Sequence, residues 1–262
     1  MTTKSESGAG FDLDVGWGSK TLAFLSAIAL GVVAWQIATW ISDGWIPGVG
    51  EIVDATAESL VAADTWEQIL ITSTRILIAF AASTAIGVAI GFASGLNRKA
   101  EAFFRPLVVI ALATPDPLYV IIAILVLGTE ESSGVIALTL ALIPFVVTIV
   151  HGSVKARESQ LDEMSAVYRF SRRRYLGQVL ARQVTPALFA AARTSFAFAW
   201  KIVVLVEAIS QPRGIGSEIY EQFRLLNAAE MIALALIFIV LMRLVDAIVF
   251  GGLERRLLAW AR

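Results

Sequence analysis

The sequence predicts an all-α polytopic membrane protein with six transmembrane helices. Hydrophobic residues make up 57% of the 262-residue chain and charged residues only 16%, and the mean hydropathy is +0.75. This composition is too apolar for an ordinary soluble domain. The apolar runs are rich in small and aliphatic residues and lack the two-residue alternation of membrane strands, so helices are favoured over a barrel.

Six stretches of the chain are long and apolar enough to cross a bilayer, because a spanning helix needs about 20 mostly apolar residues. The polar segment 1–19 ahead of them lacks the adjoining basic and apolar regions of a cleavable signal, and the first stretch can act as an uncleaved one. We expect 1–19 to be a cytoplasmic tail and 20–262 to be a single transmembrane domain. The six stretches are 20–42, 69–97, 102–128, 134–152, 186–210 and 228–250.

The basic residues predict the orientation of these helices, because short loops rich in Lys and Arg stay in the cytoplasm. They gather between the second and third stretches, between the fourth and fifth, and after the sixth. Both termini are therefore expected in the cytoplasm. The outward segments 43–68 and 129–133 are acidic instead, and carry Asp54, Glu58, Asp64, Glu67, Glu130 and Glu131.

In the third stretch, Pro115 and Pro117 flank Asp116. Each proline removes a backbone donor and disfavours helical geometry in the residue before it, so we expect this helix to break or kink near mid-membrane. A carboxylate at that depth costs about 3 kcal/mol on insertion scales and usually faces a cavity or a partner. Asp116 is therefore a candidate for the transport pathway, or else a carboxylate satisfied by backbone amides at the kink.

In the fifth stretch, Arg193, Trp200 and Glu207 recur every seven residues and so share one stripe of the helix. Lys201 lies about 100° around from Trp200, on an adjacent face. Trp200, Lys201 and Glu207 are candidate pathway residues. The alternative for Glu207 is that it snorkels or pairs near the outer end, and for Arg193 snorkelling or pairing near the inner end is favoured. Because a buried charge is costly, we expect neutralising Asp116 or Glu207 to leave folding unharmed.

The chain offers little for catalysis. It has no cysteine and a single histidine, His151, which excludes disulfides, thiolate metal sites and an imidazole cluster. No phosphate-binding loop and no Ser/His/Asp set is visible. We therefore expect no enzyme activity, no cofactor and no metal in this chain, and no nucleic acid partner.

The polar segment 153–185 separates two membrane stretches and is the expected meeting point with a soluble partner. Residues 161–168 can form a short helix, Ser171 suits the N-cap of a second one over 172–182, and Pro186 opens the next span. This pattern predicts a helix-turn-helix at the membrane surface. Anchoring to anionic headgroups accounts for the basic run 172–174, but not for the acidic start at Asp162 and Glu163.

At this point the sequence resembles a known family, the inner-membrane permease subunits of ABC importers, in the branch that handles nitrate, sulfonates, taurine, bicarbonate and thiamine precursors. The family signature runs Glu-Ala-Ala, three residues, then Gly, and this branch often begins it with Glu-Met. The resemblance covers residues 46–262. The matching positions are Ile46-Pro47 ahead of Glu51, Arg75, Glu163-Met164-Ser165, Ser171, Pro186, Trp200, Glu207-Ala208, Gly214-Ile215-Gly216, Asp246, Leu253-Glu254-Arg255-Arg256 and Trp260.

The resemblance implies a type I ABC importer permease fold, in the bacterial or archaeal inner (plasma) membrane with membrane lipid around it. It implies two ATPase subunits that bind ATP, a second permease copy or a paralogous permease, and an extracytoplasmic substrate-binding protein that delivers a small solute such as an anion. The pathway would lie at the dimer interface, lined by the third and fifth helices. The segment 153–185 becomes the ATPase-coupling loop, with Asp162, Glu163, Met164, Ser165, Ala166, Tyr168, Arg169 and Ser171 as its candidate residues.

Two departures from the family pattern bear on this loop. Arg169 stands at the usual glycine, and Ala181-Arg182 stands at the usual Leu-Pro. If the glycine serves a left-handed turn, an ordinary residue there costs roughly 1 kcal/mol. A specialised loop paired with a second, different permease is one hypothesis that follows. The different-class alternative for the whole chain is a proton-coupled secondary transporter using Asp116 and Glu207, although no inverted repeat supports it.

Overall fold

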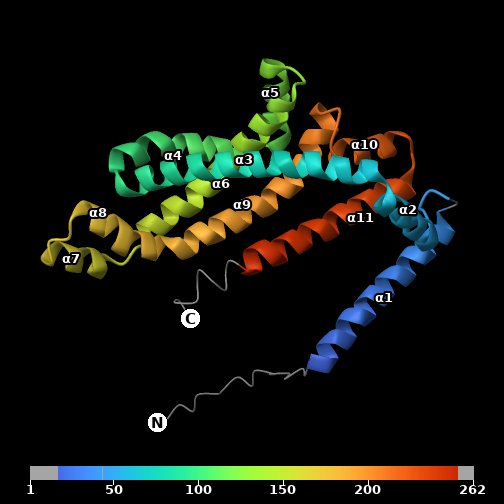
Figure 1. The fold of residues 1–262 in the computed structure, drawn as a ribbon, viewed down its shortest axis with the longest axis horizontal. Helices are drawn as coiled ribbons and strands as arrows, with labels where there is room; N and C mark the ends of the chain where they lie inside the picture. Colours follow the sequence, from blue (N-terminus) through green and yellow to red (C-terminus); the bar gives the residue numbers. More distant parts are fainter. Residues whose placement is uncertain (1–16, 43, 253–262) are drawn as a thin grey trace, which may run out of the picture. The chain divides into compact units, whose positions relative to one another are not determined.

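A computed structural model describes residues 17–42 and 44–252, which are mainly helical and contain no strand. The chain divides into two units, Met1–Val53 and Asp54–Arg262. The part of the expected tail before residue 17 and the family-like carboxyl end at 253–262 lie outside the described residues. Figure 1 shows the order of the helices along the chain.

The first unit contains the first membrane-spanning helix, α1 (Trp17–Ile41), and the start of α2 (Val49–Val61). The turn between them folds back on α1. Trp35 donates through its indole N–H to the carbonyl oxygen of Pro47 at 3.0 Å, and the Thr39 hydroxyl donates to the same oxygen at 3.2 Å. These two bonds fix the chain where it leaves the apolar span.

The second unit contains the remaining spans and the polar segment. Long helices α3 (Ala63–Leu96), α6 (Glu131–Lys155) and α9 (Ala181–Ser210) form its centre, with α6 packed against both others. The other elements are α4 (Arg98–Ala113), α5 (Asp116–Leu127), α7 (Ser159–Val167), α8 (Arg172–Arg174), the π-helix η1 (Tyr175–Leu180), α10 (Ile215–Arg224), α11 (Ala228–Val245) and the π-helix η2 (Asp246–Phe250).

The expected third span is broken where the prolines predicted it. Within the described residues five helices meet the length and hydropathy of a membrane span, and the pair α4 and α5, bent by 101°, makes a sixth if counted as one. Thr114, ahead of Pro115, takes an extended conformation with φ −77° and ψ 123°, which a residue before proline favours. The hydroxyl of Tyr119 donates to the carbonyl oxygen of Ala111 at 2.8 Å and satisfies backbone that the break exposes.

The prediction for the start of the fifth span is wrong. The second loop helix and the span form one continuous helical segment from Arg172 to Ser210, and Pro186 lies inside α9 instead of opening it. Tertiary packing explains the difference. Leu180 and Val184, which precede Pro186 by six and two residues, are fully buried in one cluster with Val150 of α6. This burial outweighs the helix-breaking tendency of the proline.

The contact between α3 and α6 rests on three glycines spaced by four residues. Gly87, Gly91 and Gly95 lie on one face of α3 and each faces a valine of α6. A Cβ atom added at Gly91 would lie 2.7 Å from the Cβ of Val150 and 3.2 Å from the carbonyl oxygen of Val147. Small residues at this spacing let membrane helices approach closely. The backbone of α3 therefore lies directly against the valine side chains of α6.

Gly91→Val is therefore expected to destabilise the protein by about 1–3 kcal/mol, because the added methyl groups force the two helices apart. Thermal unfolding of the purified protein in detergent measures the effect. Gly152→Ala on α6, where nothing lies within 4 Å of the added Cβ, is the matched control. Equal melting temperatures for both variants would contradict this account of the interface.

Candidate functional site

The short helix α7 presents a mixed surface to solvent. Tyr168 and Val167 are 71% and 78% exposed, Met164 is 40% exposed, and Glu163 is exposed beside them. Ser165 faces inward and is 6% exposed. The exposed apolar groups around one carboxylate resemble the core and charged edge of a protein interface more than a solvated helix face.

Asp162 has a different position from its neighbour Glu163. Its carboxylate accepts hydrogen bonds from Nε of Arg157 at 2.8 Å and from the hydroxyl of Tyr175 at 2.7 Å, while Arg157 also donates to the carbonyl oxygen of Val154 at 2.8 Å. The hydrogen bond to Asp162 raises the pKa of the Arg157 guanidinium. Asp162 thus braces α7 against α6 and η1, whereas Glu163 has no hydrogen bond or ion pair within the described residues.

The turn after α7 has the left-handed residue that the family glycine implies. Arg169 has φ +50°, and Ser171 caps the next helix by accepting from the backbone N–H of Arg174 at 3.4 Å. The guanidinium of Arg174 lies 4.5 Å from the centre of the Phe170 ring. The expected turn is retained, with an arginine in a conformation that favours glycine.

Arg169→Gly is accordingly expected to leave the loop intact and to raise stability by up to about 1 kcal/mol, because it relieves the left-handed strain. The gain is partly offset by the greater freedom of glycine in the unfolded chain. Thermal unfolding of the purified protein measures the net change in stability from these two effects. Val167→Gly inside α7 should instead lower stability by about 1 kcal/mol, and the same sign for both variants would contradict the strain.

Glu207 is fully buried near the C-terminal end of α9 and joins three helices. Its carboxylate accepts from the hydroxyl of Thr72 at 2.8 and 2.9 Å, from Arg75 at 2.7 Å and from the backbone N–H of Gly216 at 2.9 Å. Gly214, with φ +121°, lies in direct contact with the carboxylate, which leaves no room for a side chain there. These bonds tie α3, α9 and the start of α10 together.

Arg75 extends this network toward the surface. Its guanidinium also donates to Glu131 at 3.3 Å and to the carbonyl oxygen of Arg213, whose own side chain pairs with Glu67. The buried carboxylate is therefore fully engaged and serves first as a structural junction. The sequence singled out Glu207, Arg75 and the Gly214–Gly216 turn separately. Gly216 is only nine residues from Glu207, but Arg75 is 132 residues away, and its contact with Glu207 carries no local sequence signal.

The other candidate pathway residues differ in exposure. Asp116 is the first residue of α5 and half-buried, so its carboxylate lies at a helix N-terminus just after the proline break, where a negative charge is favoured. Trp200 is 3% exposed and packs on the ring of Phe238 at 4.5 Å between centroids. Lys201 is exposed. Within this chain the structure does not bring Asp116, Trp200, Lys201 and Glu207 into one site.

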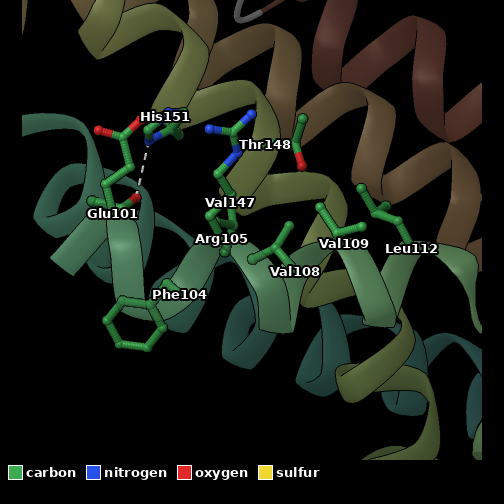
Figure 2. A pocket seen from close by; sticks show the side chains of 10 residues that line it. Glu101, Phe104, Arg105, Val108, Val109, Leu112, Val147, Thr148 and His151 are labelled. Atoms are coloured by element: carbon green, nitrogen blue, oxygen red, sulfur yellow. Dashed lines mark hydrogen bonds and ion pairs between the residues drawn. The ribbon is translucent and has the colours of Figure 1, made fainter. Parts of the chain in front are cut away.

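A polar cluster that sequence reasoning missed lies between α3, α4 and α6. Glu101 pairs with Lys155 at 2.7 Å and with His151 at 3.5 Å, and the other ring nitrogen of His151 lies 3.2 Å from the hydroxyl of Ser94. Figure 2 shows Glu101 and His151 at one end of a cavity of 380 Å³, with Arg105 beside them and aliphatic side chains at the other end. His151 and Lys155 stand four residues apart on one helix face, which was the available signal.

Neither a metal centre nor a catalytic cluster is present in the described part of the chain. No group of three His, Cys, Asp or Glu side chains there could hold a metal ion. The elements that remain are the exposed short helix α7, the buried junction at Glu207, and the charged side chains of Asp116 and Lys201 on the apolar helices.

Comparison with known proteins gives a consistent result. Residues 83–257 match the family described as "Binding-protein-dependent transport system inner membrane component". The taurine transport system permease protein TauC of Escherichia coli (strain K12) is 22% identical over 247 residues, which cover 92% of this chain and 90% of TauC. The putative aliphatic sulfonates transport permease protein SsuC of Bacillus subtilis (strain 168) is 24% identical and covers 93% of this chain and 90% of its own length.

A further relative is the nitrate import permease protein NrtB of Synechocystis sp., which is 23% identical over 81% of this chain and 80% of its own. Among solved structures, a chain of the MetNI methionine ABC transporter in an inward-facing conformation superposes with a TM-score of 0.64. That match has 17% sequence identity and covers 73% of this chain and 95% of the other. At this identity the structural match establishes the shared fold.

Proposed function

Because this chain belongs to the family of binding-protein-dependent transport system inner membrane components, we infer that it is the membrane-spanning permease subunit of an ABC importer. It is a multi-pass inner-membrane protein and does not itself catalyse a reaction. ATP is bound and hydrolysed by a separate ATPase subunit, and a substrate-binding protein is the other expected partner. The all-helical fold, with its likeness to a MetNI chain, agrees with this assignment.

The observation that carries the coupling role is the difference between two adjacent carboxylates. Asp162 is held inside by Arg157 and Tyr175, while Glu163 extends from α7 into solvent beside Tyr168. A braced helix with a free charged and aromatic surface suits a docking partner. In our proposal two ATPase subunits dock on the α7 helices of two permease chains, which are either two copies of this chain or this chain and a paralogue.

A proton-coupled secondary transporter is not favoured. It would need Glu207 to take up and release protons during transport. In the structure this carboxylate is fully buried and held by Thr72, Arg75 and the backbone of Gly216, so protonation would remove the charge that pairs with Arg75. The family membership points in the same direction.

For the cargo, we propose a small anion or a molecule that carries an anionic group. Three relatives act in taurine, aliphatic sulfonate and nitrate transport by their names, and these solutes share a compact anionic group. The pathway would run along the interface between two permease chains and use Asp116 and Lys201.

With both termini in the cytoplasm, a cysteine introduced at Ser132 should react with an impermeant thiol reagent from outside and one at Ser159 should not.

Reconstitution tests this function directly. The permease, co-expressed with its ATPase and supplied with its binding protein, is placed in proteoliposomes and assayed for uptake of radiolabelled taurine, methanesulfonate and nitrate. We expect uptake that requires ATP on the ATPase side and loaded binding protein on the other. Uptake driven by a proton gradient without the ATPase would refute the proposal and favour the secondary transporter.

A further inference from the structure

A cationic cavity lies between α9 and α11, apart from the buried junction at Glu207. Its volume is 340 Å³, near the lower end of the ~300–1,000 Å³ range of small-molecule sites. Three of its lining side chains are cationic and one is anionic, so the lining carries an excess of positive charge. The lining residues are Arg193, Thr194, Ala197, Phe198, Lys201, Met242, Arg243 and Asp246.

Lys201 lies deep in the membrane. It is nine residues before the end of α9 at Ser210, or about 13 Å along the helix axis, in a span whose hydrocarbon crossing takes about 30 Å. Lysine near the centre of a spanning helix costs about 3 kcal/mol on insertion scales, so such residues usually face a cavity or a partner instead of lipid. The exposed stripe around Lys201 includes Thr194, which is also unusual for a lipid-facing surface.

The other charges of the cavity leave Lys201 without a carboxylate. Asp246 accepts from Arg193 at 3.1 and 3.0 Å in a two-point contact, and Arg243 lies 3.5 Å from the same carboxylate. Among the described residues Lys201 has no acidic partner, and its ammonium lies 5.6 Å from the centre of the Phe198 ring. That ring is itself stacked on Phe145 at 4.6 Å, so the aromatic wall beside the ammonium is fixed.

We propose that Lys201, Arg193 and Arg243 form an intramembrane subsite for the anionic group of the transported molecule, such as a sulfonate, with Phe198 against its apolar part. This inference rests on the proposed import function and names the residues that would select its cargo. Asp246 orients the guanidinium groups of Arg193 and Arg243. The positive charge of Lys201 is not neutralised by a carboxylate of the cavity lining, so it is available to an anionic ligand. Arg243 approaches Asp246 through one nitrogen at 3.5 Å and its side chain is 75% exposed, so its other guanidinium donors can reach an anion.

The same cationic chemistry could hold the phosphate of an anionic lipid, so the experiment separates the two sources. The permease with its ATPase is placed in phosphatidylcholine nanodiscs and treated with 4-sulfophenyl isothiocyanate or with uncharged phenyl isothiocyanate. The lysine amine adds to the isothiocyanate carbon, its proton passes to the reagent nitrogen, and a thiourea forms with no leaving group. Mass spectrometry then gives the labelling ratio of the two reagents at Lys201 and, as an internal reference, at exposed Lys99.

We expect the sulfonated reagent to be preferred at Lys201 relative to Lys99, and excess methanesulfonate to protect Lys201 alone. Arg243→Gln, an exposed change that should not disturb folding, should lower the preference about tenfold, which corresponds to about 1.4 kcal/mol of lost attraction. Lys99 should show no change in that variant.

Three results would overturn the inference. One is the absence of any preference for the sulfonated reagent at Lys201. Another is protection by added phosphatidylglycerol but not by methanesulfonate, which assigns the site to lipid. The third is labelling that appears only when the second permease chain is dissociated, which assigns Lys201 to a subunit contact. Because labelling needs no transport, a chain that imports solute but shows no protection refutes only this inference, and a chain with protection but no import refutes only the proposed function.

Discussion

Replacing Glu207 by alanine is expected to lower the free energy of unfolding by about 3–5 kcal/mol, because it removes the buried counter-charge of the Arg75 guanidinium and leaves only the exposed Glu131, 3.3 Å away. The carboxylate accepts bonds from Thr72, Arg75 and the backbone N–H of Gly216, and all three of these residues are buried. From the sequence alone, neutralising this residue was expected to leave folding unharmed. The structure leads to the opposite expectation, because the charge of Glu207 is paired with that of Arg75.

Thermal or denaturant unfolding in detergent measures this loss. Glu207→Gln keeps the size and an acceptor oxygen but loses the charge, so its effect should lie between those of wild type and alanine. The matched control is Glu221→Ala, an exposed carboxylate at the end of α10 that should change stability by less than about 0.5 kcal/mol. If Glu207→Ala is as stable as the control, Glu207 is not the junction of the three helices.

Glu163→Arg is expected to abolish coupling to the ATPase while the permease itself remains folded. The side chain is exposed on α7 and makes no contact that folding requires within the described residues, so stability should change little. A reversed charge inside a docking cleft brings a penalty of several kcal/mol, whereas on a lipid-facing loop an added arginine would strengthen membrane attachment. The two roles of α7 therefore predict opposite outcomes.

Co-purification of the ATPase with the variant, and ATP hydrolysis of the complex with and without loaded binding protein, provide the measurement. Glu221→Arg places the same charge change on α10, far from α7 in Figure 1, and should leave co-purification of the ATPase unaffected. Normal association together with normal stimulation in Glu163→Arg would remove α7 from the coupling role. Since Arg169 already departs from the family pattern, a partner permease that carries the working loop would then be the next candidate.

The features that the sequence predicted well are those set by local physical chemistry. Apolar length places the membrane helices, two prolines around Asp116 predict the break between α4 and α5, and the family glycine position predicts the left-handed turn at Arg169. Each depends only on residues within one continuous segment of the chain. The short helix over 161–168 was expected for the same reason and appears as α7.

The features that were missed depend on contacts between distant segments. Burial of Leu180 and Val184 against α6 carries the helix through Pro186, and no local rule contains that contact. Glu207 reads as a costly intramembrane charge until Thr72 and Arg75 of another helix are placed beside it. For such residues the chemistry is visible in the sequence, but the partner is not.

The unbroken run of helix from Arg172 to Ser210 gives the molecule the mechanics of a lever. At 1.5 Å per residue this helical segment is about 58 Å long, so a tilt of about 10° about its N-terminal end at Arg172 moves its C-terminal end at Ser210 by about 10 Å. One end adjoins α7 and the other carries Glu207. A displacement of α7 would therefore be transmitted to the Glu207 junction as a rigid rotation of this helix. The π-helix η1, next to α7, is the place where a change of helical winding would alter the size of that rotation.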